Sequence, residues 1–147
     1  MISSKPSATS DTDSSPAIIG VIVGYGSLPD SLRDAALAIV NQPEALESVS
    51  SVSRRAEGLD DKLENVATRH PGELLMLFTD LYGSSCSLGG LGFCARHPGT
   101  AVLCGVNLAM LVRFLYYRQR LGYRELADFL LRTGREEVRQ AGNTLPR

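Results

Sequence analysis

The sequence predicts an α/β protein in which a mainly parallel sheet of about four strands lies between two helical layers. Short apolar runs rich in β-branched residues occur at 17–23 (AIIGVIV), 73–79 (ELLMLFT) and 100–104 (TAVLC). Such continuous runs are typical of strands buried on both faces of a parallel sheet. Apolar residues recur at helical spacing between the runs, and this alternation implies right-handed crossovers and a three-layer α/β/α architecture.

The first half of the chain is expected to form a strand, a helix, a second strand and a second helix. A glycine-flanked turn at 24–26 breaks the first strand, and apolar residues at helical spacing then fill residues 28–40. Pro29 is tolerated in the first turn of that helix, where its missing N–H is not needed. Residues 46–52 are expected to form a weaker strand, and residues 59–68 a polar helix with one apolar side.

The second half continues the alternation. A glycine-rich helix that reaches about residue 95 is expected after the strand at 73–79, and its glycines suggest close packing against a neighbour. These glycines are Gly89, Gly90 and Gly92. Asn107 can cap the helix that follows the strand at 100–104. A last helix is expected from about residue 123 to about residue 140.

Length and composition predict one globular domain. The chain has 147 residues, of which 44% are hydrophobic and 21% charged, values that are ordinary for a single core. Residues 1–16 carry almost no large apolar side chain, so we expect a disordered N-terminal tail, a domain at 17–141 and a C-terminal tail at 142–147. A formal net charge of −1 provides no basic field, so nucleic acid is not expected as a partner.

Targeting and cysteine patterns favour a cytoplasmic protein without a metal or cofactor. The sequence contains no secretory signal and no apolar run of about 20 residues. Cys86, Cys94 and Cys104 lack CxxC spacing, which argues against a disulfide framework or a zinc site. We interpret them as small buried side chains.

Loops of small residues follow three of the predicted strands, at 24–27, 80–85 and 105–107. Because parallel strands end at one edge of a sheet, these loops must converge there, and ligands bind in that crevice. Backbone N–H groups and helix N-termini in such loops favour an anion, and phosphate is the natural candidate. Asp80 either orients a nucleophilic group there or caps the turn that follows it.

Four segments of the chain resemble, in order, the mannose-class IIA components of the bacterial sugar phosphotransferase system. They read GYGSLPD (24–30), DLYGSSC (80–86), CGVNLAMLV (104–112) and ELADFLLRTGREEV (125–138). Members of that family accept a phosphoryl group from a phosphocarrier protein onto a histidine and pass it to a IIB component. The resemblance implies the same fold, these two partners, a homodimer and peripheral association with a membrane permease complex.

The resemblance also assigns site residues. It places Tyr25 at the position of the phospho-acceptor histidine and Asp80 at that of the acidic residue beside it. Ser85 corresponds to the hydroxyl that helps to hold the phosphoryl group. The other phosphate-binding positions are Gly26, Gly83, Ser84 and Asn107.

The chain departs from the family pattern at the acceptor itself. Tyr25 stands in place of the histidine, Ser84 in place of a loop glycine and Cys86 in place of a proline. A phosphohistidine gives up its phosphoryl group readily, whereas a tyrosine phosphate is a stable ester, and a phenol is mostly protonated at neutral pH.

Two functions therefore stay open, and with them the question of enzymatic activity. One is a IIA component or paralogue in phosphoryl relay for sugar uptake or its regulation. The other is a pseudo-IIA module that binds proteins without phosphoryl transfer. An unrelated hydrolase or nucleotide-binding domain is disfavoured because the sequence lacks the GxGxxG, GxxxxGK[ST] and GxSxG motifs.

The histidines of the chain, His70 and His97, are not expected to replace the missing imidazole. Each precedes a strand, and strands of about 5–7 residues at about 3.3 Å per residue separate that edge from the crevice by roughly 16–23 Å. Each is followed by proline, which favours a solvent-facing turn residue. Several arginines either bind phosphate or an acidic partner or form a solvated helix face. They are Arg113, Arg118, Arg120 and Arg124.

Overall fold

A four-stranded sheet forms the centre of the computed structural model, which describes residues 15–52 and 57–142. The strands are β1 (Ile18–Tyr25), β2 (Leu46–Ser51), β3 (Leu74–Thr79) and β4 (Ala101–Cys104). All pairings are parallel, in the order β2-β1-β3-β4, which confirms the predicted sheet and its weaker second strand. The predicted tails at 1–16 and 142–147 fall almost entirely outside the described residues.

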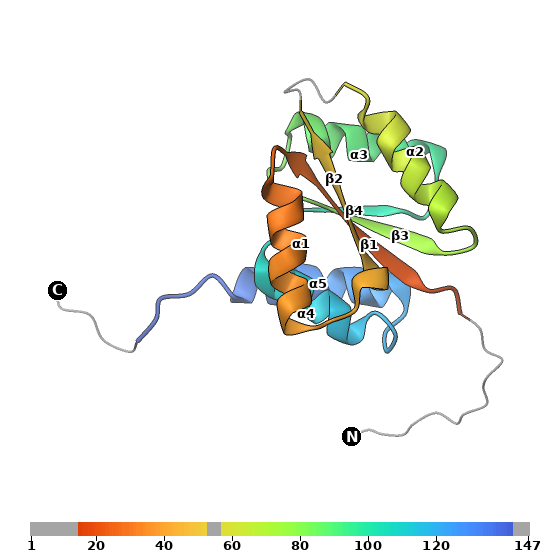
Figure 1. Cartoon of the computed structure of the whole chain (residues 1–147). Helices are drawn as coiled ribbons and strands as arrows, with labels where there is room; N and C mark the ends of the chain where they lie inside the picture. The colour runs from red at the N-terminus through yellow and green to blue at the C-terminus, as the bar shows by residue number, and fades with distance from the viewer. Residues whose placement is uncertain (1–14, 53–56, 143–147) are drawn as a thin grey trace.

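Helices cover both faces of this sheet (Figure 1). They are α1 (Leu28–Ile39), α2 (Leu59–Arg69), α3 (Ser85–Arg96), α4 (Leu108–Tyr117) and α5 (Tyr123–Glu136), with a short 3₁₀ turn, η2 (Pro43–Ala45). Helices α2 and α3 lie on one face, and α1, α4 and α5 on the other. The prediction extended α5 too far, because Val138 beyond its end is 83% exposed and offers no apolar face to hold another turn.

The core consists of two apolar clusters separated by the sheet. β1 is central, so Ile18 and Ile22 pack into the cluster of the α1, α4 and α5 layer, and Val21 and Val23 into that of the α2 and α3 layer. This alternation explains why the strand reads as a continuous apolar run. Apolar side chains are therefore buried on both faces of the sheet that carries the loops at its ends.

The glycine-rich helix α3 packs closely at two of its three predicted glycines. A Cβ atom added to Gly89 would lie 2.6 Å from Leu59 Cδ2, and one added to Gly90 would lie 3.2 Å from Val102 Cγ2. At Gly92 the nearest neighbour is Arg96 Nη1 at 3.9 Å, which is an ordinary contact. Close packing therefore explains Gly89 and Gly90, and not Gly92.

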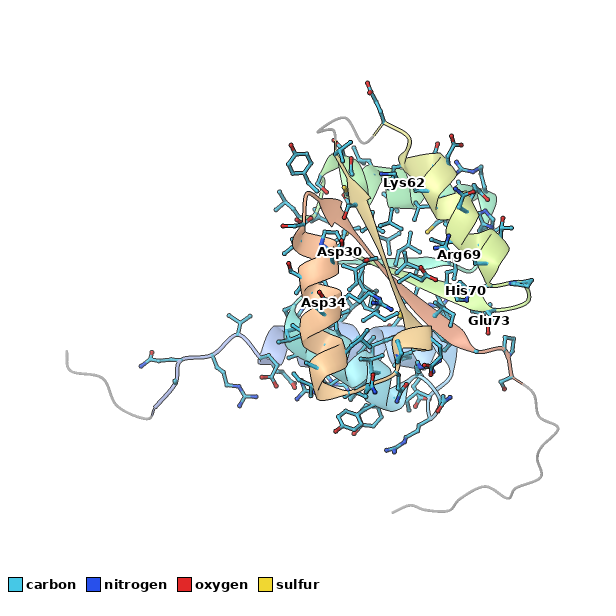
Figure 2. All side chains as sticks on the ribbon, in the orientation of Figure 1. Asp30, Asp34, Lys62, Arg69, His70 and Glu73 are labelled. Atoms are coloured by element: carbon cyan, nitrogen blue, oxygen red, sulfur yellow. The ribbon has the colours of Figure 1, made fainter. Side chains whose placement is uncertain are left out.

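Charged side chains cover the free edge of β2. Arg33 Nε donates to the Leu46 carbonyl at 2.6 Å, and Lys62 Nζ donates to the Ser50 carbonyl at 2.7 Å. Figure 2 shows Asp30 on α1 and Lys62 on α2 on either side of this strand. Edge carbonyls that are already bonded to charged side chains cannot readily pair with another chain.

Both histidines lie at the N-terminal edge of the sheet as predicted, but the expectation that they face solvent is wrong for His70, whereas the His97 side chain is 35% exposed. The His70 side chain is 15% exposed, and its Nε2 and Nδ1 atoms lie 2.8 Å from Glu47 and Glu73 (Figure 2). His97 Nε2 lies 2.9 Å from Glu64. The repeated segment Arg-His-Pro-Gly, at 69–72 and 96–99, thus ends a helix and binds a glutamate each time. Burial opposes the charge of His70, but its hydrogen bonds to Glu47 and Glu73 outweigh this effect and raise the pKa of the imidazole.

Of the two interpretations of the arginines, the solvated helix face is wrong for Arg118. Its side chain is 4% exposed, and its guanidinium donates to the Ile18 carbonyl at 3.1 Å and to Gln42 Oε1 at 3.2 Å. Burial lowers the pKa of this guanidinium. The reason is geometric, because the end of α4 meets the start of β1, where a buried carbonyl needs a donor. By contrast, Arg120 and Arg124 are exposed, as a solvated helix face requires.

Candidate functional site

The ends of β1, β3 and β4 meet at the C-terminal edge of the sheet. Val23, two residues before the end of β1, pairs with Thr79, the last residue of β3, so the two strands end side by side. The Thr79 carbonyl accepts hydrogen bonds from Gly105 N and Val106 N, each at 2.9 Å, which ties the loop after β4 to the end of β3. The three loops that the sequence singled out are thus gathered at one edge.

Tyr25 is the last residue of β1, directly before the turn to α1, and is 53% exposed. The turn is tight, because a Cβ atom on Gly24 would lie 3.1 Å from Pro29 Cγ. Gly26 follows with a positive φ of 68°, a conformation that favours glycine. Its N–H donates to the Ser51 carbonyl at 3.0 Å. Gly26 therefore shapes the turn that presents the phenol, and its N–H is already engaged.

The N-terminus of α3 forms the opposite wall of the site. Gly83 turns the chain with a φ of 82°, and Ser84 caps the helix by accepting from Ser87 N at 3.1 Å. Ser85 is the exposed first residue of α3. A helix start of this kind presents N–H groups and a positive dipole end, which favour an anion.

Asp80 directly follows β3, and its negative charge affects the Cys86 thiol in the first turn of α3. Burial raises the pKa of the Cys86 thiol, and the negative charge of Asp80 raises it further. The carboxylate is half-buried. It is therefore placed between the end of the sheet and the helix start, where it would influence any group bound between them.

Asn107 is confirmed as the cap of α4. Its Oδ1 accepts from Met110 N at 3.0 Å, and its Nδ2 donates to the Gly134 carbonyl at 3.2 Å. A Cβ atom on Gly134 would lie 2.7 Å from Met110 Cε, so α4 and α5 pack closely there. Both ends of the Asn107 amide are thus engaged in the junction of α4 with α5.

Sequence reasoning missed a set of exposed apolar side chains on the elements that meet at this edge, called the apolar collar below. It consists of Tyr25, Leu81, Tyr82, Leu88 and Leu91, with exposed fractions of 53%, 65%, 86%, 61% and 57%. These residues come from the end of β1, the loop before α3 and the first two turns of α3. Large exposed apolar groups that gather in one region mark interaction surfaces. The available signal was the apolar pair Leu81 and Tyr82 in a loop otherwise made of small and polar residues.

Thr79 is a second feature that the sequence did not reveal. Its side chain is completely buried, and within the described part of the chain Oγ1 is a buried polar atom without a hydrogen-bond partner. The position of a threonine at a strand end predicts nothing about whether its hydroxyl is satisfied.

Features elsewhere in the molecule do not belong to this candidate site. A cavity of about 610 Å³ lies at the opposite edge of the sheet, lined by Ile18, Arg118 and Tyr123 among others, and it contains none of the residues that the resemblance assigns to the site. Among residues 15–52 and 57–142, no cluster of three or more histidine, cysteine or acidic side chains could hold a metal ion. The helices described here are all too short or too polar to cross a bilayer.

Comparison with known proteins gives a result only at the level of structure. No protein-family model matches the chain, and no curated protein matches it. Solved structures do match. Their sequence identities to this chain are 12–19%, so the similarity establishes the fold alone.

The matching structures include IIA subunits of the phosphotransferase system. The mannose/sorbose-specific IIA subunit of Enterococcus faecalis aligns with a TM-score of 0.73 at 19% identity, over 89% of this chain and 98% of that subunit. The EIIA component of Streptococcus agalactiae aligns with a TM-score of 0.69 at 19% identity, over 84% of this chain and 96% of the other. A sigma-54 interaction domain protein of E. faecalis gives 0.68 at 12% identity, over 86% and 100%. The chain therefore has the fold of mannose-class IIA proteins across most of its length.

Proposed function

We propose that this chain is a mannose-class IIA-like protein that binds partners of the phosphotransferase system and does not relay phosphoryl groups. The supporting observation is the exposed phenol of Tyr25, which the sequence resemblance assigns to the position of the acceptor histidine. Both histidines are bonded to glutamates at the other edge of the sheet, so neither supplies an imidazole to the crevice.

The chemistry of Tyr25 supports a binding role. Relay requires a nucleophile that accepts a phosphoryl group and then releases it to the next protein. A phenol is mostly protonated at neutral pH, and once phosphorylated it forms a stable ester. Tyr25 can fill the space of the acceptor side chain, but we expect it to neither accept nor return phosphate at a useful rate.

The remaining site residues have separate roles in this proposal. Ser84, Ser85 and the start of α3 form an anion cradle, and Gly83 shapes it. Asp80 would orient and charge-stabilise a nucleophile placed at position 25. Two further predicted phosphate-binding residues act as scaffold: they are Gly26 and Asn107.

Partner binding is supported by the apolar collar. Its exposed leucines and tyrosines belong to the elements that form the cradle, where a phosphocarrier or a IIB component would have to dock. We place the protein in the cytoplasm as a homodimer, with peripheral association at a membrane permease complex. A regulatory role is favoured by one comparison, because a sigma-54 interaction domain protein shares the fold.

Active phosphoryl relay is the second candidate. It is favoured by Asp80 and Ser85, which the sequence resemblance assigns to the acidic partner and the phosphate-holding hydroxyl. The two candidates differ in one measurable property, which is acid-labile phosphorylation of the wild-type protein.

The test is incubation with phosphoenolpyruvate, the general phosphotransferase enzyme and the phosphocarrier, followed by intact mass before and after acid treatment. We expect no acid-labile phosphate on the wild type, and its appearance on a Tyr25→His variant. Tyr116→His is the matched control, since Tyr116 is 50% exposed on α4 and the same change there creates no acceptor in the cradle. Titration with the phosphocarrier should give the same affinity for the wild type and for Tyr25→His. Acid-labile phosphate on the wild type would reject the proposal in favour of relay.

A further inference from the structure

The cavity of about 610 Å³ at the N-terminal edge of the sheet has a volume in the range of small-molecule sites. Its wall comes from the start of β1, the start of β3 and the loop that joins α4 to α5. Tyr25 lies at the opposite edge, so this cavity is separate from the site of the proposed function. The side chains of the wall define the class of ligand that it suits.

Arg118 supplies a buried charge to this wall. Its side chain is 4% exposed, and Nη1 donates to the carbonyl of Ile18, which also lines the cavity. Buried charges in proteins are normally paired with an opposite charge. Among the described residues, the carboxylate that pairs with Arg118 belongs to Glu44, 3.5 Å from Nη2, and the Glu44 side chain is 69% exposed. Solvent screens such a pair, so Glu44 is a weak counterion.

The charge of Arg118 is therefore only partly compensated by the protein. Burial lowers the pKa of the guanidinium, and the negative charges of Glu44 and Glu73 raise it by less. A guanidinium binds a carboxylate through two parallel N–H···O bonds, which makes this pairing both strong and specific. A carboxylate bound in the cavity would add the compensation that Glu44 provides weakly.

The other charges of the wall also favour an anion. Arg120 is exposed there, and the described residues that line the cavity include no aspartate or glutamate. Gly122, the N-cap of α5, lines it as well and has no side chain to cap the first N–H groups of that helix. The end of α4 opposes an anion only weakly, because the Tyr117 carbonyl already accepts from Arg120 N and Leu121 N.

Apolar side chains form another part of the wall. They belong to Ile18, Leu74 and Leu121. A mainly apolar wall with a few fixed polar groups is typical of sites for small organic molecules. We propose that this cavity binds a small organic carboxylate, with its charged end at Arg118 and Arg120 and its apolar body against these three side chains.

The first test titrates the full chain with three probes and follows the backbone amide signals of residues 118–123 by NMR. Hexanoate should bind saturably. Hexylammonium has a tail of similar length and the opposite charge, and it should leave these signals unchanged. Acetate keeps the charge without the tail and should bind at least about tenfold more weakly than hexanoate. No saturable binding of hexanoate, or equal binding of hexylammonium, would overturn the proposal.

The second test separates binding from stability at Gly122. A Cβ atom there would have no neighbour within 4 Å, and φ is −67°, so a side chain is tolerated. Gly122→Asp and Gly122→Asn can both cap α5, and both should keep or raise the unfolding midpoint. The charge of Gly122→Asp should make the dissociation constant of hexanoate about fivefold higher than for Gly122→Asn. Equal dissociation constants would overturn the proposal.

The third test removes one arginine at a time. Arg120 and Arg132 are both exposed, and each lies over an aromatic ring, at 5.8 Å from the Tyr117 centroid and 5.6 Å from the Phe129 centroid. Arg132 does not line the cavity. Arg120→Gln should weaken hexanoate binding about threefold, and the matched control Arg132→Gln should leave it unchanged.

Arg118→Gln should abolish hexanoate binding, with the amide spectrum of the variant used to check that it is folded. Wild-type affinity in folded Arg118→Gln, or equal affinities of Arg120→Gln and Arg132→Gln, would overturn the proposal. Because Arg118 also stabilises the fold, the Gly122 and Arg120 variants decide the outcome if Arg118→Gln does not fold.

Discussion

At the N-terminal edge of the sheet, both histidines and Arg118 are bonded to glutamates or to a backbone carbonyl. At the C-terminal edge, a phenol is exposed, apolar side chains face solvent, and the buried Thr79 hydroxyl has no hydrogen-bond partner among the described residues. The two ends belong to the same strands and helices, so this difference does not come from the fold. The bonded side chains of the N-terminal edge contribute to stability, whereas the C-terminal edge carries features that stability alone does not require.

The N-terminal edge should respond most strongly to the loss of Arg118. Its removal leaves the buried Ile18 carbonyl without a donor and opens the junction of α4 with β1. We expect Arg118→Ala to lower the free energy of unfolding by about 3 kcal/mol, measured by urea denaturation. Arg124→Ala, at an exposed position of α5, should change it by less than about 0.5 kcal/mol. Equal effects of the two substitutions would contradict the assignment of Arg118 as a buried anchor.

Helix α3 runs from one edge to the other and allows a comparison within a single element. Gly89→Ala should destabilise the protein by about 1–3 kcal/mol, because the new Cβ atom would lie 2.6 Å from Leu59 Cδ2. Gly92→Ala should stabilise it by up to about 1 kcal/mol, since the position is open and alanine favours a helix. Urea denaturation of both variants gives the sign of each effect. Stabilisation by Gly89→Ala would show that α3 does not pack closely on α2.

The sequence predicted those features whose cause is local. The apolar run of β1 and the cap of α4 by Asn107 depend on neighbouring residues, and both are confirmed. The environment of Arg118 was missed because its partners, Ile18 and Gln42, are separated from it by 100 and 76 positions. A pattern of helical spacing shows which face of α4 is apolar, but it does not show that the end of the helix meets a buried carbonyl.

In the candidate site too, some features could be predicted from the sequence and others depend on the packed structure. The convergence of the loops near Tyr25 and Asp80 follows from parallel topology, which the sequence does reveal. The state of Thr79 does not follow, because hydroxyl satisfaction depends on distances within a packed interior. The engaged N–H of Gly26 is a similar case, since its acceptor on β2 becomes apparent only when the strands are aligned.

The smallest expected effect concerns pH and the bond between His70 and Glu47. Hydrogen bonds raise the pKa of His70 above its ordinary value of 6.5, so the folded state binds this proton more tightly than the unfolded state. The resulting stability is fully present below about pH 6.5 and is lost as the pH rises through the folded pKa. Burial opposes the charge of Glu47, but Arg69 and His70 lower the pKa of its carboxyl below 4.5, so its contribution is lost in acid.

A His70→Gln variant keeps a side chain that can form hydrogen bonds but removes the titration. Urea denaturation at about pH 6 should show the variant less stable than the wild type by up to about 1 kcal/mol, and the difference should shrink by about pH 9. Adding Glu47→Gln should reduce the pH dependence further, because the two groups act on each other. A difference that stays constant with pH would mean that His70 contributes through packing alone. In that case the N-terminal edge would owe its stability to Arg118 and the helix ends, and the contrast with the C-terminal edge would rest on burial and not on charge.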